Sequence, residues 1–425
     1  MRQISVTRVL TLCLGALVLS ATTVAAADWP QFRGPGGRGQ SSATGLPAQW
    51  SAETNIVWKA NLPGPGASSP VTFGDKIFLT CYSGYGMEED STGDISQLKR
   101  HLLCLSQADG KVLWNAVQPS TQEEGAYQGF TALHGYASST PAVDAEAIYV
   151  FFGATGAAAY SHDGQPLWLT SCGTKTHEWG SATSPVLHEN LVLINASVES
   201  RSLIALDKKT GQEVWRQGGM DMSWNTPALV KTSGGWELVV QVKSKILGFD
   251  PATGNPLWTC QGVEDYVCPS VVAEGDVVYV IGGRQARAIA VRAGGRGDVT
   301  ETHKLWEVRK GSNVSSPVVH DGHLYWAHEG RGSVYCVDAK TGEGGYEERL
   351  NPRPGRIYAS PLAADGKLYY VSRDAGVFVL AARPEFELLA HNKIDTDASI
   401  FNGSPAVAGG RLLLRSDRAL YCIGK

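Results

Sequence analysis

The chain has 425 residues, enough for two or three ordinary domains or for one large repetitive β domain. Its net charge is −4 and only 18% of its residues are charged, which excludes a globally basic surface for nucleic acid. The composition combines 49 glycines with 12 tryptophans, and helix-forming runs are scarce, as expected of many short strands joined by tight turns.

The first 27 residues have the features of an export signal. Arg2 and Arg8 precede a short apolar run, and Ala25–Ala27 forms a small-residue cleavage site. The run is too short to span a membrane comfortably, and the apolar residues that follow Cys13 argue against a lipid-anchored cysteine. We therefore expect cleavage near Ala27 and a periplasmic or secreted protein without a membrane span.

Residues 28–54 are expected to form an extended segment that precedes the regular units. The stretch DWPQFRGPGGRGQ places Gly34, Gly36 and Gly39 in the G-x-G-x-x-G spacing of dinucleotide-binding loops. That motif needs a buried strand before it and a helix after it, whereas prolines and further glycines interrupt both flanks here. We therefore expect these glycines to serve a loop that crosses the surface, without a phosphate site.

A proline-headed phrase recurs throughout residues 55–425, as in SSPVTFGDKIFLT, SSPVVHDGHLYWA and NGSPAVAGGRLLLR. Its prolines are Pro70, Pro141, Pro185, Pro227, Pro269, Pro317, Pro361 and Pro405. In each unit an apolar strand follows the proline, a hairpin turn leads into a second strand, and a third and a fourth strand follow. Most units are roughly 44 residues long. This repeat predicts an all-β protein, an eight-bladed β-propeller of four-stranded antiparallel blades.

The two ends of the repeat region complement each other. The last unit stops after RALYCIGK, one strand short, whereas NIVWKANLPG near the start is a spare strand. Pairing these two segments would remove two exposed sheet edges. We therefore predict that residues 56–60 form the outermost strand of the last blade and close the ring.

Two sequence positions recur within the units, one aromatic and one small. The aromatic position, four residues after the turn glycine in the clearest units, is expected to pack between blades; it holds Trp114, Trp168, Trp215, Trp258, Trp306 and Tyr346. The small position, in the third strand, holds Cys104, Ala159, Ala205, Gly248, Ala290, Cys336, Val379 and Cys422.

The cysteines are expected to be structural residues. Seven follow the signal, and none forms a C-x-x-C pair, which argues against zinc, redox-motif and c-type haem sites. One or two disulfides remain compatible with an oxidising compartment. The residue before the repeated proline is Ser or Thr in seven units and Cys268 in the fifth, so we interpret Cys268 as a substitute for serine.

Several units carry a family resemblance. IALDKKTGQEVW, GFDPATGNPLW and SSPVVHDGHLYWAHEGRGSVYCVDAKTG resemble the PQQ-like propeller repeat of quinoprotein alcohol dehydrogenases and of the assembly scaffold BamB. The resemblance covers about residues 55–425, and WPQFRGPGGRGQS is similar to the start of exported proteins of this class from planctomycete-type bacteria. The chain lacks the vicinal cysteine pair of many quinoproteins, their haem motif and an assignable calcium set. We also expect it to lack the lipidated cysteine by which BamB is anchored.

The candidate binding face contains the loops that enter each first strand and those that join second to third strands. Arginines beside aromatic residues in these loops favour an anionic or planar ligand, or an acidic peptide. The candidate ligand-binding residues are His134, Tyr136, Glu178, Trp179, Asp221, Trp224, Asn225, Asp265, Tyr266, Arg284, Asn313, Arg331, Arg356, Tyr358 and Arg373. We assign no metal site and no catalytic residue.

Two functions fit this pattern. We expect an exported, monomeric binding scaffold for a protein or for an anionic or planar ligand, without nucleic acid and without a required cofactor. The alternative, implied by the resemblance, is an alcohol or sugar dehydrogenase that uses PQQ with calcium. In that alternative the quinone would lie among the aromatics, its carboxylates would pair with the arginines, and Asp221, Glu178 or Asp265 would be the base.

Overall fold

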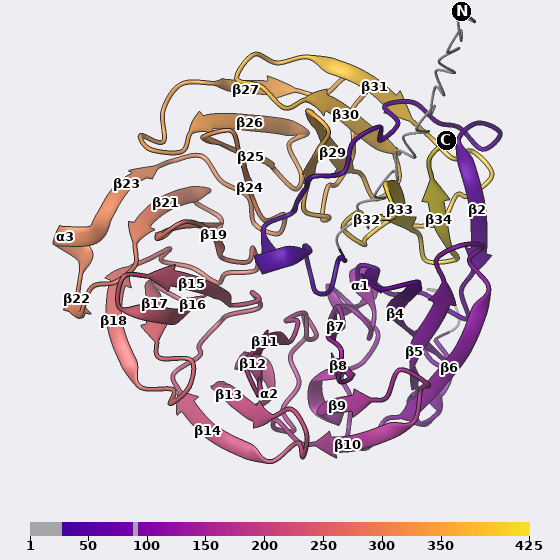
Figure 1. Cartoon of the computed structure of the whole chain (residues 1–425), viewed down its shortest axis with the longest axis horizontal. Helices are drawn as coiled ribbons and strands as arrows, with labels where there is room; N and C mark the ends of the chain where they lie inside the picture. Colours follow the sequence, from indigo (N-terminus) through magenta and orange to yellow (C-terminus); the bar gives the residue numbers. More distant parts are fainter. Residues whose placement is uncertain (1–27, 88–91) are drawn as a thin grey trace, which may run out of the picture.

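The computed structural model describes residues 28–87 and 92–425, in which eight four-stranded antiparallel blades form a ring (Figure 1). The structure therefore confirms the eight-bladed β-propeller. Residues 1–27, for which we expect an export signal, lie outside the described residues. Each blade begins at the central channel with a short first strand, and its fourth strand lies at the rim.

The hairpin between the first two strands has turn residues suited to its geometry. Between β28 (Leu362–Ala364) and β29 (Lys367–Val371), Asp365 and Gly366 have φ angles of 53° and 67°. Two consecutive positive φ angles are typical of the type I′ turn, which Asp-Gly favours and which matches the twist of the paired strands. This turn sets the register in which Ala364 pairs with Lys367.

The first four blades follow one another in chain order. Blade one contains β3 (Val71–Phe73), β4 (Lys76–Ser83), β5 (Lys99–Ser106) and β6 (Val112–Pro119). Blade two contains β7 (Ala142–Val143), β8 (Ile148–Phe151), β9 (Ala157–Tyr160) and β10 (Pro166–Thr170). Blade three contains β11 (Val186–His188), β12 (Leu191–Ala196), β13 (Ser202–Asp207) and β14 (Glu213–Gly218). Blade four contains β15 (Ala228–Thr232), β16 (Gly235–Val242), β17 (Lys245–Phe249) and β18 (Pro256–Gln261), with β22 (Gly297–Asp298) added in parallel.

The other four blades complete the ring. Blade five contains β19 (Val272–Glu274), β20 (Val277–Gly282), β21 (Arg287–Arg292) and β23 (Lys304–Val308). Blade six contains β24 (Val318–His320), β25 (His323–Ala327), β26 (Ser333–Asp338) and β27 (Tyr346–Arg349). Blade seven contains β28, β29, β30 (Val377–Ala381) and β31 (Leu388–Asn392). Blade eight contains β32 (Ala406–Ala408), β33 (Arg411–Arg415), β34 (Ala419–Ile423) and β2 (Ile56–Asn61). The short helices are η1 (Pro35–Gly37), η2 (Ile95–Gln97), η3 (Gly153–Thr155), α1 (Thr131–His134), α2 (Ser197–Ser200) and α3 (Thr300–His303).

The ring closes as the sequence predicts. Strand β2 pairs antiparallel with β34, and Trp58 lies opposite Cys422. The first and last parts of the propeller thus share one sheet, and blade eight has four antiparallel strands like the other blades. This pairing covers the edge of β34 and one edge of β2, each of which would otherwise be unpaired.

The aromatic position packs between blades, and the small position makes room for it. Trp215 pairs with Ala205 across blade three, and its indole Nε1 donates a hydrogen bond of 3.1 Å to Pro251 O in blade four. Gly254 lies in the turn before the fourth strand of blade four and has a φ of 72°. A Cβ atom there would lie 2.6 Å from the Trp215 ring. Trp58, Trp114, Trp168 and Trp306 make corresponding hydrogen bonds to the next blade.

A closed circle of hydroxyl groups surrounds the channel where the first strands begin. We call it the hydroxyl ring: each member's backbone N–H donates to the side-chain hydroxyl of the next member, at 2.9–3.1 Å. Its members are Ser69, Thr140, Ser184, Thr226, Ser270, Ser316, Ser360 and Ser404. The ring ties all eight blades together at their inner ends.

The hydroxyl ring corrects our alignment of the fifth unit. Ser270 supplies the ring hydroxyl there, so Cys268 is not the serine substitute that we predicted. Pro269 precedes the ring residue, whereas in the sixth unit Pro317 follows Ser316. The prediction was wrong because it aligned the repeat units by their prolines. The position that is constant in the structure is the hydroxyl residue, because hydrogen bonds to the two neighbouring blades fix it.

The N-terminal segment does not cross the surface as predicted; it enters the central channel (Figure 1). We call residues 29–41 the channel plug. Pro30 O accepts a hydrogen bond from Val143 N, Gly39 O accepts one from Ala363 N, and β1 (Gln40–Ser41) pairs with β28. The plug thus touches first strands of several blades. The expectation failed because the glycines and prolines exclude regular strands and helices but do not determine which surface the loop meets.

The glycines of the plug allow close packing in the channel. Gly34 has a φ of 72°, and a Cβ atom there would lie 2.5 Å from the Trp29 indole. Gly39 has a φ of 70°, and its Cβ would lie 2.6 Å from the Arg33 guanidinium. These glycines therefore serve backbone conformation and packing, and no helix of normal length begins behind them as a dinucleotide-binding loop would need.

The seven cysteines of the described residues are all free, so none of them takes part in a disulfide. Cys104, Cys336 and Cys422 each lie opposite an aromatic residue, where they are small buried side chains as predicted. Within residues 28–87 and 92–425, none of the helices has the length and apolar character needed to cross a membrane.

Candidate functional site

A cavity of about 530 Å³ opens on the face that carries the loops entering the first strands, which we call the top face. Its floor contains six members of the hydroxyl ring together with Phe32 from the channel plug. Because the plug fills the channel below the ring, the cavity is a blind pocket at the propeller axis. Cavities of this size hold small molecules.

One wall of the cavity is aromatic. The Trp179 ring lies 4.9 Å from that of Trp224, 4.5 Å from that of Tyr266 and 5.4 Å from that of Phe130, measured between centroids. Trp224 is fixed from both sides, because its Nε1 donates to Gly180 O at 2.8 Å and its backbone N donates to Val267 O at 2.8 Å. The wall is therefore a rigid surface on which a flat ligand can lie.

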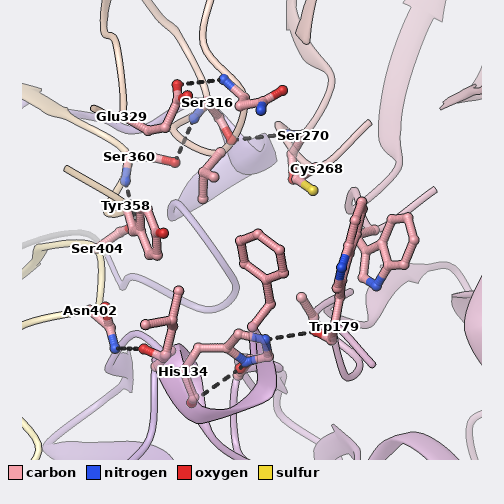
Figure 2. Close-up of a pocket in the computed structure, with 18 of the residues that line it drawn as sticks. His134, Trp179, Cys268, Ser270, Ser316, Glu329, Tyr358, Ser360, Asn402 and Ser404 are labelled. Atoms are coloured by element: carbon pink, nitrogen blue, oxygen red, sulfur yellow. Dashed lines mark hydrogen bonds between the residues drawn. The ribbon is translucent and has the colours of Figure 1, made fainter. Parts of the chain in front are cut away.

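The opposite wall is polar. Glu329 Oε2 accepts a hydrogen bond of 2.8 Å from Asn313 N, and the Asn313 side-chain amide donates to the Tyr266 hydroxyl at 2.5 Å. Asn313 Oδ1 is buried and has no hydrogen-bond partner among the described residues. Tyr358, Ser360, Asn402 and Glu329 lie on this side of the pocket in Figure 2, across from Trp179 and Cys268.

Two exposed arginines stand at the cavity mouth. The Arg284 guanidinium lies 5.2 Å from the centroid of the Tyr266 ring, and Arg356 donates to the Tyr358 hydroxyl at 3.4 Å. Neither guanidinium forms an ion pair with a carboxylate of the described residues. Since Glu329 is the only described acidic residue in the lining, the side chains of the cavity carry an excess of positive charge.

Residues 120–141, the insertion between blades one and two, form a strap over one side of the cavity. Its helix α1 ends at His134, which hydrogen-bonds through Nε2 to Trp179 O at 2.8 Å and through Nδ1 to Ser138 Oγ at 2.6 Å (Figure 2). Leu133 O accepts hydrogen bonds from Arg373 at 2.7 Å and from Asn402 at 2.9 Å. The strap is thus anchored to blades on both sides of the ring axis.

Burial controls the protonation of several groups here. It lowers the pKa of His134, so this imidazole is neutral at pH 7, with Nε2 donating to the Trp179 carbonyl. It raises the pKa of the Cys268 thiol to about 12, which leaves the thiol protonated and unreactive. It lowers the pKa of Arg33 in the plug to about 9, and this arginine therefore keeps its charge at pH 7.

The structure brings eight of the fifteen predicted site residues into the cavity lining. They come from loops of different blades, as the placement of the repeats led us to expect. They are His134, Trp179, Trp224, Tyr266, Arg284, Asn313, Arg356 and Tyr358.

The other seven lie elsewhere, and each has a physical reason to do so. Asn225 is fully buried, and its amide donates to Ser223 Oγ and Gln241 O. Glu178 and Arg331 are exposed. The remaining four bind other protein groups: Asp221 pairs with Arg201, Asp265 accepts from Tyr266 N and Arg284 N, Tyr136 packs among other tyrosines, and Arg373 lies behind Tyr358.

Several lining residues were missed. Glu329 lies in the second-to-third loop of blade six, two residues from Arg331, and Phe130 and Asn402 lie in loops that enter first strands. These loops had been assigned to the correct face, so the signal was present. Phe32 could not have been found, because nothing in its local sequence places it in the channel.

Among the described residues, no cluster of three or more His, Cys, Asp or Glu side chains is arranged to hold a metal ion. Glu329 is the only carboxylate of the described lining, and it already accepts the Asn313 N–H. A calcium ion needs six or more oxygen ligands, and many of them are usually carboxylates. The donor set of this cavity does not fit such an ion.

A buried carboxylate below the top-face loops makes stability depend on pH. Glu199 in α2 is 2% exposed and accepts a hydrogen bond from Ser181; burial raises its pKa from 4.5 to about 7. Since the folded state then binds the proton more tightly, its stabilising contribution is complete below pH 4.5 and is lost as the pH rises through 7. We expect urea unfolding to show a loss of about 3 kcal/mol from this group between pH 4.5 and pH 8.

The matched variant for this prediction is Glu199→Gln, which keeps the hydrogen-bonding shape of the side chain but does not titrate. Its free energy of unfolding should change less between pH 4.5 and pH 8 than that of the wild type, by about 3 kcal/mol. Equal pH dependence in the two proteins would contradict the assignment of this proton to Glu199.

Comparisons with known proteins extend these observations. The sequence profile of the family described as "Outer membrane protein assembly factor BamB" matches residues 40–200, 199–300 and 297–385. No curated protein matches the sequence.

Solved structures share the fold at low identity. A europium-containing methanol dehydrogenase is 11% identical with a TM-score of 0.64, over 91% of this chain and 89% of its own. The quinohemoprotein alcohol dehydrogenase of Comamonas testosteroni is 11% identical with a TM-score of 0.60, over 93% of this chain and 80% of its own. The computationally designed Ika8 protein is also 11% identical, with a TM-score of 0.59, over 87% of this chain and all of its own. Enzymes and a designed protein thus share this architecture, so the fold alone does not set the function.

Proposed function

The chain belongs to the family described as outer membrane protein assembly factor BamB, and from this premise we propose that it is a binding propeller whose top-face cavity holds a small planar anion. The observation that carries the proposal is the pairing of a rigid aromatic wall with two arginines that form no ion pair within residues 28–87 and 92–425, above a floor closed by the channel plug. We also propose that the protein is exported and acts in the periplasm or outside the cell, as its first 27 residues suggest.

The chemistry of the cavity supports a flat, negatively charged ligand. Trp179, Trp224 and Tyr266 offer stacking surfaces, and stacking on such rings adds to the free energy gained by removing apolar area from water. Arg284 and Arg356 present planar donor groups that match carboxylates in a bidentate manner. The neutral His134 and the protonated Cys268 do not cancel this positive charge.

A quinoprotein dehydrogenase is the second candidate, because PQQ is itself a flat tricarboxylate. The aromatic wall and the two arginines fit PQQ as a planar anion. The donor set does not fit the calcium ion that this enzyme class uses with it, since Glu329 is the only carboxylate of the described lining. We therefore include PQQ among the ligands to test and derive no catalytic step from it.

A protein partner is the remaining alternative for this family of scaffolds. A protein surface would bind across the top-face loops and would not need a cavity of about 530 Å³ with a closed floor. The cavity therefore favours a small ligand over a protein as the occupant of this site.

Calorimetry with PQQ and with benzene-1,3,5-tricarboxylate tests the proposal. We expect one ligand to bind per chain, and Arg284→Ala and Arg356→Ala each to weaken binding by about tenfold, because each removes a charged hydrogen-bond donor at an exposed mouth. The uncharged trimethyl ester of the tricarboxylate should bind more weakly than the acid. Quenching of tryptophan fluorescence would report the same binding at the aromatic wall.

Arg331→Ala is the matched control, since Arg331 is an exposed arginine of the same face outside the cavity lining. It should change the affinity less than twofold. The proposal is contradicted if the wild type binds neither acid, or if Arg331→Ala weakens binding as much as Arg284→Ala does.

A further inference from the structure

The hydroxyl ring has hydrogen-bond donors that no acceptor in the described part of the chain uses. Every ring hydroxyl oxygen accepts a backbone N–H from its neighbour, as in Ser270 N to Ser316 Oγ at 2.9 Å and Ser316 N to Ser360 Oγ at 3.0 Å. A hydroxyl also carries one O–H donor. Among the described residues, no acceptor receives a hydrogen bond from any of the eight ring hydroxyls.

Six of these hydroxyl-bearing residues line the cavity, and four of them are labelled in Figure 2. The six are Ser184, Thr226, Ser270, Ser316, Ser360 and Ser404. Their oxygens are occupied by backbone N–H groups, so the ring presents hydrogens more readily than lone pairs to a molecule in the pocket. Ser69 and Thr140 belong to the same ring but do not line the cavity.

A buried positive charge lies directly beneath this floor. Arg33 is 2% exposed, its guanidinium donates to Pro317 O and to Arg38 O, and its Nε and Nη1 have no partner among the described residues. Arg33 also shares a small void with the ring residues Thr226 and Ser270. In the described residues no carboxylate pairs with it. The floor thus combines O–H donors with an uncompensated cation.

We propose that the hydroxyl ring is the anion-binding floor of the cavity, where the O–H groups of Ser316, Ser360 and their cavity-lining neighbours donate to carboxylate or carbonyl oxygens of the ligand. This assignment rests on the proposed function and adds an orientation to it. The flat part of the ligand lies against the aromatic wall, and one oxygen-bearing edge points down the propeller axis toward Arg33.

Holding the blades together does not account for the free donors. The ring joins the blades through backbone N–H groups that donate to hydroxyl oxygens. Joining the blades therefore requires only the acceptor oxygen of each hydroxyl and not its hydrogen. A hydroxyl hydrogen that faces a cavity is satisfied only by water or by a ligand. All eight ring residues therefore serve closure through their oxygens, and the six that line the cavity also serve ligand binding through their hydrogens.

The test compares ring residues inside and outside the cavity. Ser316→Ala, Ser360→Ala and Ser69→Ala each remove one hydroxyl and leave one neighbouring backbone N–H without its acceptor. The structural cost should be similar for the three, which thermal unfolding will check. Affinity for benzene-1,3,5-tricarboxylate, measured by calorimetry on the full chain, should fall about tenfold for Ser316→Ala and Ser360→Ala. It should fall less than twofold for Ser69→Ala.

The outcomes separate this inference from the proposed function. If the wild type binds the tricarboxylate and all three variants weaken it equally, the ring is structural and the inference is overturned, while the proposed function stands. If the wild type binds neither this acid nor PQQ, the proposed function fails and the inference fails with it. Should a single alanine variant not fold, Ser360→Thr and Ser69→Thr, which keep the hydroxyl, should both retain wild-type affinity.

Discussion

Replacing Trp215 by alanine should lower the free energy of unfolding by about 3–5 kcal/mol, the range for removing a large buried aromatic side chain. Trp215 is 8% exposed, packs in the core between blades three and four, and bonds through its indole N–H to Pro251 O at 3.1 Å. The variant loses apolar contacts and leaves a cavity beside Gly254. A side chain at Gly254 would clash with the indole, so the indole packs directly against the glycine backbone. Urea denaturation followed by circular dichroism measures the change.

Arg331→Ala is the control for this experiment as well, since an exposed loop residue should contribute less than about 0.5 kcal/mol. Trp215→Phe should recover part of the loss, because a smaller ring keeps much of the contact but not the hydrogen bond. Equal losses for Trp215→Ala and Arg331→Ala would refute the interblade role of the aromatic position.

Replacing Arg100 by methionine should cost about 3–5 kcal/mol, because it breaks a buried ion pair and leaves the carboxylate alone. Arg100 Nη2 lies 2.8 Å from Glu124 Oε1, and the two side chains are 3% and 7% exposed. Arg100 also donates to Ser120, Thr155 and Tyr136 O, so it fastens the strap to blades one and two. Denaturant unfolding at pH 7 gives the loss.

The double variant Arg100→Met/Glu124→Leu distinguishes charge burial from general packing. Removing both charges takes away the desolvated, unpaired carboxylate, so the double variant should be clearly more stable than Arg100→Met alone. A double variant that is less stable than the single one would show that the remaining carboxylate is not the source of the loss.

The sequence predicts the blades well because each unit repeats its own local physics. The small third-strand residues lie opposite the aromatic position in successive blades, as in the pairs Cys104–Trp114 and Ala290–Trp306, and both positions follow from periodic strands and turns. The exception shows the limit. In the fifth unit the proline precedes the ring residue Ser270 instead of following it, a displacement of two residues, and only the hydrogen bonds around the ring reveal which residue occupies the position.

The site was predicted less completely, because the sequence identifies a face but not the direction in which each loop side chain points. Trp224 and Asn225 are adjacent, yet the indole lines the cavity while the amide binds Gln241 O beneath it. Asp221 lies in the same loop and pairs with Arg201 outside the cavity. The channel plug was missed for a related reason: its contacts with Val143, Pro317 and Ala363 are all far away in the sequence.

The pairing of β2 with β34 also determines when the molecule can be completed during synthesis. The hydrogen bonds around this junction join residues 335 and 342 positions apart, as in Ser404 N to Ser69 Oγ and Trp50 N to Asn392 Oδ1. Contacts of such long range form late, because a long loop must be closed before they give any return in free energy. A nascent chain that has not yet produced residues 419–423 is therefore an open arc with two unpaired edges. Each edge is a template for the matching edge of another copy, and strand exchange between chains is the misfolding route that this architecture invites.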